Sequence, residues 1–328
     1  MLQRVEDDSL LSATNAMITQ CGAWSAIFNI LEGSKHTRDQ IIFPACTFTT
    51  EHRQFAISAA TNETEVRECH AVFSSVLKAT ELEDQDTFVR NTVHGVMVGD
   101  KRCRYKVFCI RDDETGAVIA AHAGVLVGLD TEGTAVFIGT YAATNPIFGN
   151  GGLMRQLLAS SLMQAAYDAH ARDETLVSII GDCTSSSERT WNQTGRSRIY
   201  IPDGVDPKIY QEVQFQQASL RFDVNGLPTG DAGVVSEHLM ARVFVGTGLS
   251  REMISDAVKA TYAWCEGQWD PNYFSNTAAY KVFLGHFHGL MSRFNEQLRG
   301  GNEPLFLFTQ TRRNAMIDND GYKFRGEE

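Results

Sequence analysis

Glycines at one point of the chain stand between a predicted strand and a predicted helix. The turn Gly149-Asn150-Gly151-Gly152 follows an extended segment that ends near Thr144, and a helical pattern begins at Leu153. Glycines let a ligand approach the backbone closely. The amides of a first helical turn are unpaired and lie at the positive end of the helix dipole. The segment therefore predicts a phosphate site, with a plain turn as the alternative of about equal weight.

The segments around this turn alternate between strand and helix patterns. A helix follows the first strand, three strands separated by turns come next, and the glycine turn leads into a long helix and a further apolar strand. This order is not that of a doubly wound dinucleotide-binding fold. Strands are predicted over residues 54–60, 105–110, 117–129, 134–144 and 176–181, and helices over 62–77 and 152–170.

The order and the turn together resemble the GNAT superfamily of acyl-CoA N-acyltransferases, over about residues 54–224. The family motif V-x-P-x-Y-R-G-x-G-[IL]-G-x-x-L-L falls in register with Thr144, Pro146, Phe148, Gly152, Leu153, Leu157 and Leu158. Gly149 and Met154 depart from it, since the family has arginine or glutamine at the first position and a small residue at the second. The expected fold class is α/β (α+β mixed sheet), GNAT-like, with an N-terminal extension and a mostly helical C-terminal region.

The resemblance implies a donor site for acetyl-CoA or another acyl-CoA, bound as co-substrate. The pantetheine arm would pair with the end of the third strand of the meander like an added strand, and the pyrophosphate would sit on the glycine turn. The implied donor-binding residues are Ala142, Ala143, Thr144, Gly149, Asn150, Gly151, Gly152 and Leu153.

Candidates for general base are His122 and Asp182. An amine nucleophile must lose a proton, which suits a histidine near its normal pKa. His122 lies in an otherwise apolar strand, and the alternative of a satisfied core histidine is about twice as favoured. Asp182 follows the buried strand at the sheet end where the acceptor is expected to enter.

The usual general acid of the family, a tyrosine, falls on Trp191. Indole cannot act as an acid at neutral pH, so Trp191 is interpreted as a packing residue of a short helix over residues 185–195. Tyr141, Tyr200 and Tyr210 remain as candidates for the acid. The run Ser185-Ser186-Ser187 lacks the glycine-flanked nucleophile motif, so no serine hydrolase is predicted.

Composition limits the classes of partner. The net charge is −11 and the pI about 5.3, which argues against nucleic-acid binding and is compatible with a small-molecule amine acceptor. Seven cysteines at irregular spacing predict neither disulfides nor a metal site. No signal peptide or membrane-spanning run is evident, so the expected location is cytoplasmic.

The predicted organisation is an N-terminal helical extension (1–53) with a helix over 13–31, a GNAT-like domain (54–228) and a mostly helical region (229–328). Segments 198–201 and 215–224 are expected to form a last strand pair, and fraying is expected after about Arg312. The apolar stripe over 282–298 must pack on something. It predicts either a cover over the acceptor side or a homodimer interface.

Two other functions stay open on sequence alone. One is an acyltransferase that uses acyl-carrier protein or an aminoacyl donor, for which Arg189, Arg196 and Arg198 would supply a basic patch. The other is a non-catalytic CoA-binding module with the same fold, which the departures at Gly149, Met154 and Trp191 favour.

Overall fold

The computed structural model describes residues 46–49, 54–77, 82–131, 133–148, 153–192, 194–244, 250–269, 271–299 and 305–326. The predicted N-terminal helix over 13–31 lies outside them. The chain forms two compact units. The first unit runs to Val96 and again over Arg102–Ile179, and the second contains Met97–Lys101, Ile180–Asn192 and Arg196–Glu328.

Antiparallel strands form the sheet of the first unit. The order is β1-β2-β5-β6-β7-β8, with antiparallel pairing from β1 to β7. A small separate sheet pairs two short strands, β3 and β4. The strands are β1 (Cys46–Thr49), β2 (Gln54–Ala59), β3 (Val96–Val98), β4 (Lys101–Cys103), β5 (Tyr105–Asp112), β6 (Val118–Gly128), β7 (Thr134–Thr144) and β8 (Thr175–Cys183).

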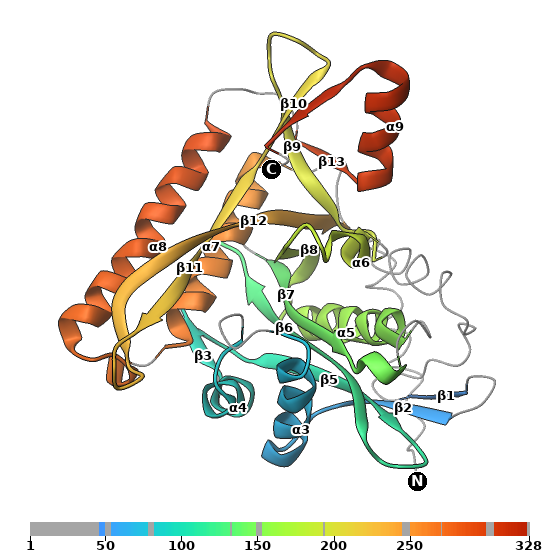
Figure 1. Cartoon of the computed structure of the whole chain (residues 1–328), viewed down its shortest axis with the longest axis vertical. Coiled ribbons are helices and arrows are strands. Elements are labelled where there is room, and N and C mark those ends of the chain that lie inside the picture. Colours follow the sequence, from blue (N-terminus) through green and yellow to red (C-terminus); the bar gives the residue numbers. More distant parts are fainter. Residues whose placement is uncertain are drawn as a thin grey trace. The chain divides into compact units, whose positions relative to one another are not determined.

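Helices cover both faces of this sheet (Figure 1). Helix α3 (Glu63–Ser74) begins at Asn62, whose side chain accepts a hydrogen bond from the Glu65 amide, and α4 (Gln85–Val93) begins at Asp84 in the same way. Such caps satisfy amides that the helix cannot. Helix α5 (Leu153–His170) covers the other face. Successive side chains of a strand point to opposite faces of the sheet. Along β6 and β7, one residue therefore faces α3 and α4 and the next faces α5.

The second unit has a mixed sheet. Next to the end of β8, the strand order in this sheet is β12-β9-β10-β14. In addition, β11 pairs with β12, and β13 pairs with β9. The β10–β14 pair is parallel. The strands are β9 (Ser197–Pro202), β10 (Ile209–Glu212), β11 (Gln214–Phe222), β12 (Pro228–Val243), β13 (Phe306–Phe308) and β14 (Lys323–Arg325).

Helices of the second unit bury apolar stripes against this sheet. Phe283, Phe287, Leu290, Phe294 and Leu298 make the buried face of α8, which packs on β12, β11 and α7. The helices are α6 (Glu188–Asn192), α7 (Arg251–Gly267), η3 (Pro271–Tyr273), α8 (Thr277–Leu298) and α9 (Gln310–Asp320). None of the helices in the described residues is long and apolar enough to cross a membrane.

Two predictions of local structure are wrong. The chain does not fray after Arg312, because α9 continues to Asp320 and ends on Gly321 in the left-handed conformation, which glycine adopts without cost. Strands β9 and β11 exist but do not pair with each other. Both pair instead with β12. Polar and apolar residues are mixed along β12, so its sequence does not predict a strand.

The predicted division at residues 53 and 228 stays a prediction. The two compact units group residues differently, since Arg196–Glu328 fall together in the second unit. Residue 228 is where β12 begins, directly after the β11–β12 turn. The strand register of that hairpin joins both sides of the predicted boundary, for example Phe222 with Pro228.

Candidate functional site

The predicted strand before the glycine turn and the predicted helix after it both form. Strand β7 ends at Thr144, a short 3₁₀ helix η2 (Pro146–Phe148) follows, and α5 begins at Leu153. The Asn145 amide continues the ladder by donating to the Ile119 carbonyl over 2.8 Å. Residues 149–152, the four turn residues predicted to bind phosphate, lie outside the described residues. The helix start that follows them leaves first-turn amides without partners in the helix.

The end of β7 is set apart from the rest of that strand by a β-bulge. Tyr141 lies opposite Ala123 while Gly139 lies opposite Gly124, so Thr140 is the extra residue. Its hydroxyl donates to the Ala123 carbonyl over 2.9 Å. Bulges redirect a strand and are frequent beside active sites. The predicted pantetheine-binding residues Ala142, Ala143 and Thr144 follow this bulge directly, opposite His122, Ala121 and Ala120.

The first turn of α5 packs into the apolar core. Leu153 and Leu157 are buried in a cluster with residues of β2, β5 and β6, and Met154 packs against the same cluster. Leu153 can therefore contribute to a donor site only through its backbone. The departure of Met154 from the family motif has a structural explanation here, because its side chain covers apolar surface.

His122 is a core residue. Its side chain is 0% exposed, and its Nδ1 lies 2.8 Å from the Ser161 hydroxyl on α5. That hydroxyl donates to the Leu157 carbonyl, so Nδ1 carries the proton in this pair. A base must reach its substrate, and complete burial under α5 argues against that role for His122. The burial of His122 and its Nδ1 contact with Ser161 support the alternative interpretation as a core histidine.

Tyr141 faces the opposite side of the sheet, where it meets a buried carboxyl group. Glu83, which precedes α4, accepts a hydrogen bond from Tyr105 over 2.7 Å and another from Tyr141. The Tyr141 ring also packs on Phe73 and Phe88, at centroid distances of 5.7 and 6.1 Å. Two phenols thus hold one carboxyl group between α3, α4 and the sheet.

Glu83 is the residue of this site that the sequence does not reveal. Its side chain is buried, and burial raises its pKa above the ordinary value, while the hydrogen bonds of Tyr141 and Tyr105 act in the opposite direction. The His70 Nε2 lies 2.8 Å from the backbone carbonyl of Glu83 and fixes the loop there. A shifted buried carboxyl group is typical of functional sites. No motif in the sequence marks Glu83, so only the packing of the folded chain singles it out.

Glu83→Gln is expected to flatten the pH dependence of stability. A carboxyl group whose pKa is higher in the folded than in the unfolded chain binds more protons when folded. Stability is therefore full below the ordinary pKa of 4.5 and is lost as pH rises through the folded value. Glutamine keeps an oxygen for Tyr105 but cannot ionise. Urea denaturation from about pH 5 to about pH 8 measures the slope. Glu114→Gln, in the exposed hairpin turn, is the control, and equal slopes in all three proteins would contradict the expectation.

The remaining predicted residues lie in the second unit. Asp182 is half-buried near the end of β8, and its role as a base stays a prediction. Trp191 is buried on α6 with the Arg196 guanidinium 4.2 Å above its ring, which supports its interpretation as a packing residue. Arg196 is buried, and burial lowers its pKa to about 9.

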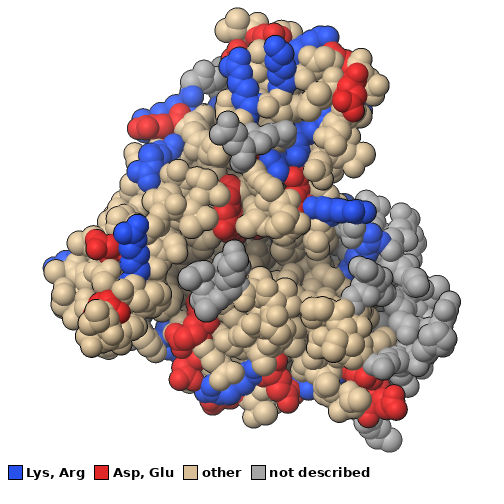
Figure 2. Space-filling model, in the orientation of Figure 1, with Lys and Arg blue, Asp and Glu red and all other residues tan. Residues whose placement is uncertain are grey.

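The predicted basic patch does not form. Arg196 and Arg198 are buried, and Arg198 is paired with Glu188 and Glu212. Only Arg189 of the three is exposed. The face drawn in Figure 2 carries acidic and basic side chains interspersed. The alternative that depends on this patch, an acyl-carrier or aminoacyl donor, thereby loses its supporting feature.

Comparisons with known proteins give matches by structure alone. No family model and no curated protein sequence matches the chain. The GCN5-related glucosamine N-acetyltransferase region of a fungal multi-domain β-N-acetylglucosaminidase matches with TM-score 0.33 and 12% identity, over 53% of this chain and 22% of that one.

Two further solved structures match the chain at similar scores. Glucosamine-6-phosphate N-acetyltransferase from Arabidopsis thaliana matches with TM-score 0.32 and 12% identity, over 43% of this chain and 90% of that one. The NatC complex bound to Gag peptide and CoA matches with TM-score 0.33 and 9% identity, over 58% and 99%.

The fold class predicted from the sequence is confirmed. The first unit has a helix pair after its first long strand, an antiparallel meander, the strand–turn–helix segment and a further strand. The two acetyltransferase structures named above are what the chain is similar to, and the fold class itself follows from its own strand order and pairing.

Proposed function

We propose that the first unit transfers an acetyl or other acyl group from acyl-CoA to an amine, by direct attack within a ternary complex. The observation that carries the proposal is the bulged end of β7 leading through η2 into the start of α5. The end of β7 would offer backbone groups to the pantetheine amides, and the start of α5 would offer amides to the phosphate oxygens.

The donor would be held mainly by backbone groups. Ala142, Ala143 and Thr144 would pair with the pantetheine arm, and residues 149–153 would donate amide hydrogens to the pyrophosphate. Side chains matter less in such a cradle, which is why the loss of the family's arginine at Gly149 is compatible with binding. Arg155, half-buried on the first turn of α5, would add a charged donor.

On the acceptor side, Tyr141 is our candidate for the general acid. The amine nitrogen attacks the thioester carbonyl and loses its proton to a base or ordered water. The tetrahedral intermediate then expels the CoA thiolate, which takes a proton from the Tyr141 hydroxyl. Glu83 accepts hydrogen bonds from Tyr141 and Tyr105, so it would orient the Tyr141 hydroxyl and act as a positioning residue.

Gly152→Glu is expected to abolish acetyl-CoA binding with little change in stability. The new carboxylate would lie against the pyrophosphate, whereas helix starts tolerate acidic residues well. Calorimetry with acetyl-, succinyl- and long-chain acyl-CoA measures the affinity. Gly285→Glu is the matched control, because a side chain at Gly285 of α8 meets open space. Parent-like binding by Gly152→Glu would remove the glycine turn as the phosphate site.

Turnover separates the proposal from a non-catalytic CoA-binding module. Purified protein is mixed with acetyl-CoA and a panel of primary amines, and the released CoA thiol is followed with a disulfide reagent. Thiol release that requires an amine supports transfer. Binding by calorimetry without amine-dependent release would favour the non-catalytic module.

A further inference from the structure

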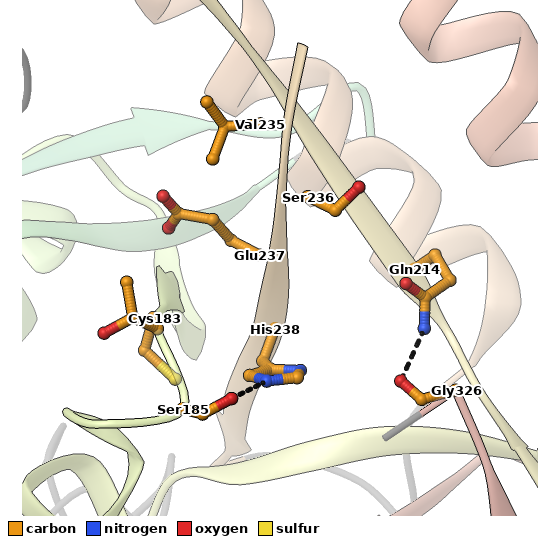
Figure 3. Close-up of a pocket in the computed structure, with 9 residues that line it drawn as sticks. Cys183, Ser185, Gln214, Val235, Ser236, Glu237, His238 and Gly326 are labelled. Carbon is orange, nitrogen blue, oxygen red and sulfur yellow. Dashed lines mark hydrogen bonds between the residues drawn. The ribbon is translucent and has the colours of Figure 1, made fainter. Parts of the chain in front are cut away.

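A cavity lies within the second unit. Its volume is about 240 Å³. Strands β8, β11 and β12 and the residue after β14 form its walls (Figure 3). The lining residues are Cys183, Thr184, Ser185, Gln214, Val235, Ser236, Glu237, His238 and Gly326.

Ser185, His238 and Glu212 form a continuous hydrogen-bonded chain at this cavity. The Ser185 Oγ lies 2.8 Å from His238 Nε2, and the two side chains point toward each other in Figure 3. On the other side of the imidazole, His238 Nδ1 lies 2.7 Å from Glu212 Oε1. A hydroxyl, an imidazole and a carboxylate in this order are the groups of a nucleophilic serine site.

The direction of each hydrogen bond follows from the charges. Glu212 is buried, and its other oxygen accepts from the Arg198 guanidinium over 3.2 Å. The Arg198 guanidinium can only donate, and the oxygens of a carboxylate only accept. His238 Nδ1 must therefore donate to Glu212. In the neutral imidazole, Nε2 is then the acceptor and takes the hydrogen of the Ser185 hydroxyl.

A buried ionic network holds the carboxylate in place. Arg198 also bonds Glu188 over 2.5 Å, and Arg313 of α9 bonds Glu188 over 3.0 Å. Burial acts to lower the pKa of Arg198, but the carboxylates of Glu212 and Glu188 outweigh it and raise that pKa. Each member comes from a different element, which leaves the Glu212 carboxylate little freedom. A fixed carboxylate orients the imidazole, which is its role in such sites.

Ser185 is placed as a nucleophile needs to be. It is exposed in the turn between β8 and α6, whereas His238 behind it is 8% exposed. The neighbouring Cys183 is a poor competitor. Burial raises the pKa of its thiol to about 12, and the thiol donates to the Met240 sulfur. The site thus has one hydroxyl that is open to substrate and backed by a base.

We propose that Ser185, His238 and Glu212 form a second active site, which hydrolyses esters of short carboxylic acids through an acyl-serine. This activity is independent of the acyl-CoA transfer proposed for the first unit. A cavity of about 240 Å³ is below the range of roughly 300–1,000 Å³ that drug-sized ligands occupy. It therefore suits a short acyl chain.

The reaction balances with water as the second reactant. Ser185 Oγ bonds to the ester carbonyl carbon while its proton passes to His238 Nε2. The intermediate collapses, the bond to the alcohol oxygen breaks, and that oxygen takes the proton from Nε2. Water then attacks the acyl-serine carbonyl and gives a proton to Nε2. The carboxylic acid leaves, and Ser185 regains its hydrogen from His238.

Active-site labelling tests the proposal on the full chain. The protein is treated with a fluorophosphonate and, separately, with p-nitrophenyl acetate, and intact mass and peptide mass spectra are recorded. We expect one phosphonyl group per chain on Ser185, attached with loss of fluoride, and ester hydrolysis that Ser185→Ala lowers by about 10³-fold or more. Ser186→Ala, which removes the adjacent hydroxyl, is the control and should label and hydrolyse like the parent.

A second pair of variants guards against a purely structural role of the chain of hydrogen bonds. Glu212→Gln and His238→Ala are measured for labelling rate, and their folding is checked by circular dichroism. Folded variants that label at least about 10-fold more slowly support the proposal. An unlabelled parent, label on another serine, or a folded His238→Ala that labels at the parent's rate would each overturn it. A failure to detect amine-dependent CoA release would not contradict the ester-hydrolysis proposal, because the two activities use different residues.

Discussion

Glu188→Ala is expected to lower the free energy of unfolding of the second unit by about 3–5 kcal/mol. Glu188 is 1% exposed and binds two arginines, with Arg198 Nη2 at 2.5 Å and Arg313 Nη1 at 3.0 Å. Its removal leaves two buried guanidinium groups with Glu212 as the remaining carboxylate bonded to Arg198. Breaking a buried pair costs far more than the pair itself contributes, because the remaining charge cannot be solvated.

Urea denaturation followed by tryptophan fluorescence measures this loss, since Trp191 and Trp264 are buried in the second unit. Asp203→Ala is the matched control. Asp203 pairs with Arg325 at 3.4 Å in the same unit, but the arginine side chain is 59% exposed, and surface pairs contribute about 0–1 kcal/mol. Equal losses in the two variants would show that the Glu188 network is hydrated and weak.

Local patterns predict the longer strands of the first unit and the helices α3 and α5, but not α4 or the short strands β1, β3 and β4. The apolar run of β6, the Asn62 cap of α3 and the turn closed by Gly116 each depend on residues near one another in the chain. The strand bounds at Thr134–Thr144 agree with the prediction to the residue. These elements are specified locally, by side-chain period and turn chemistry, so a single sequence reveals them.

The contacts that make sites are not specified locally. Glu83 meets Tyr105 and Tyr141 only because α4 packs on the sheet. Ser185, Glu212 and His238 are similarly separated, and strand pairing of β12 brings them together. No spacing rule links them. The sequence predicts no nucleophilic serine because a glycine-flanked motif is absent. That motif describes one backbone turn that exposes a serine, and it does not describe the hydrogen bonds that activate the hydroxyl.

The apolar stripe of α8 has a partner that the sequence does not indicate. Its buried face packs on β11, β12 and α7 of its own unit, so the stripe needs neither an acceptor cleft nor a second copy to leave water. A role of residues 229–328 over the acceptor, and a homodimer through these helices, stay predictions without this support. Truncation near Gly230 would remove most of β12, so β9 and β11 would each lose the strand with which they pair.

A point substitution at Gly230 tests how α8 is held on that strand. Gly230 has φ +86°, and a Cβ built on it would lie 2.1 Å from the Ala279 carbonyl oxygen. Ala279 is in the first turn of α8, where its amide donates to the capping side chain of Asn276 over 2.8 Å. The obstacle is backbone, so no side-chain rotation relieves it, and the helix start must move away from β12.

Gly230→Ala is therefore expected to destabilise the second unit by about 3–5 kcal/mol, combining the left-handed backbone penalty with overpacking. Gly226→Ala separates the two terms. Gly226 has a similar φ of +77°, but its Cβ would meet nothing within 4 Å, so only the backbone penalty of about 1–2 kcal/mol applies. Urea denaturation read from Trp264 fluorescence gives both values. If the two variants lose the same stability, the added methyl group at residue 230 does not clash with the Ala279 backbone, and β12 and α8 are farther apart than described.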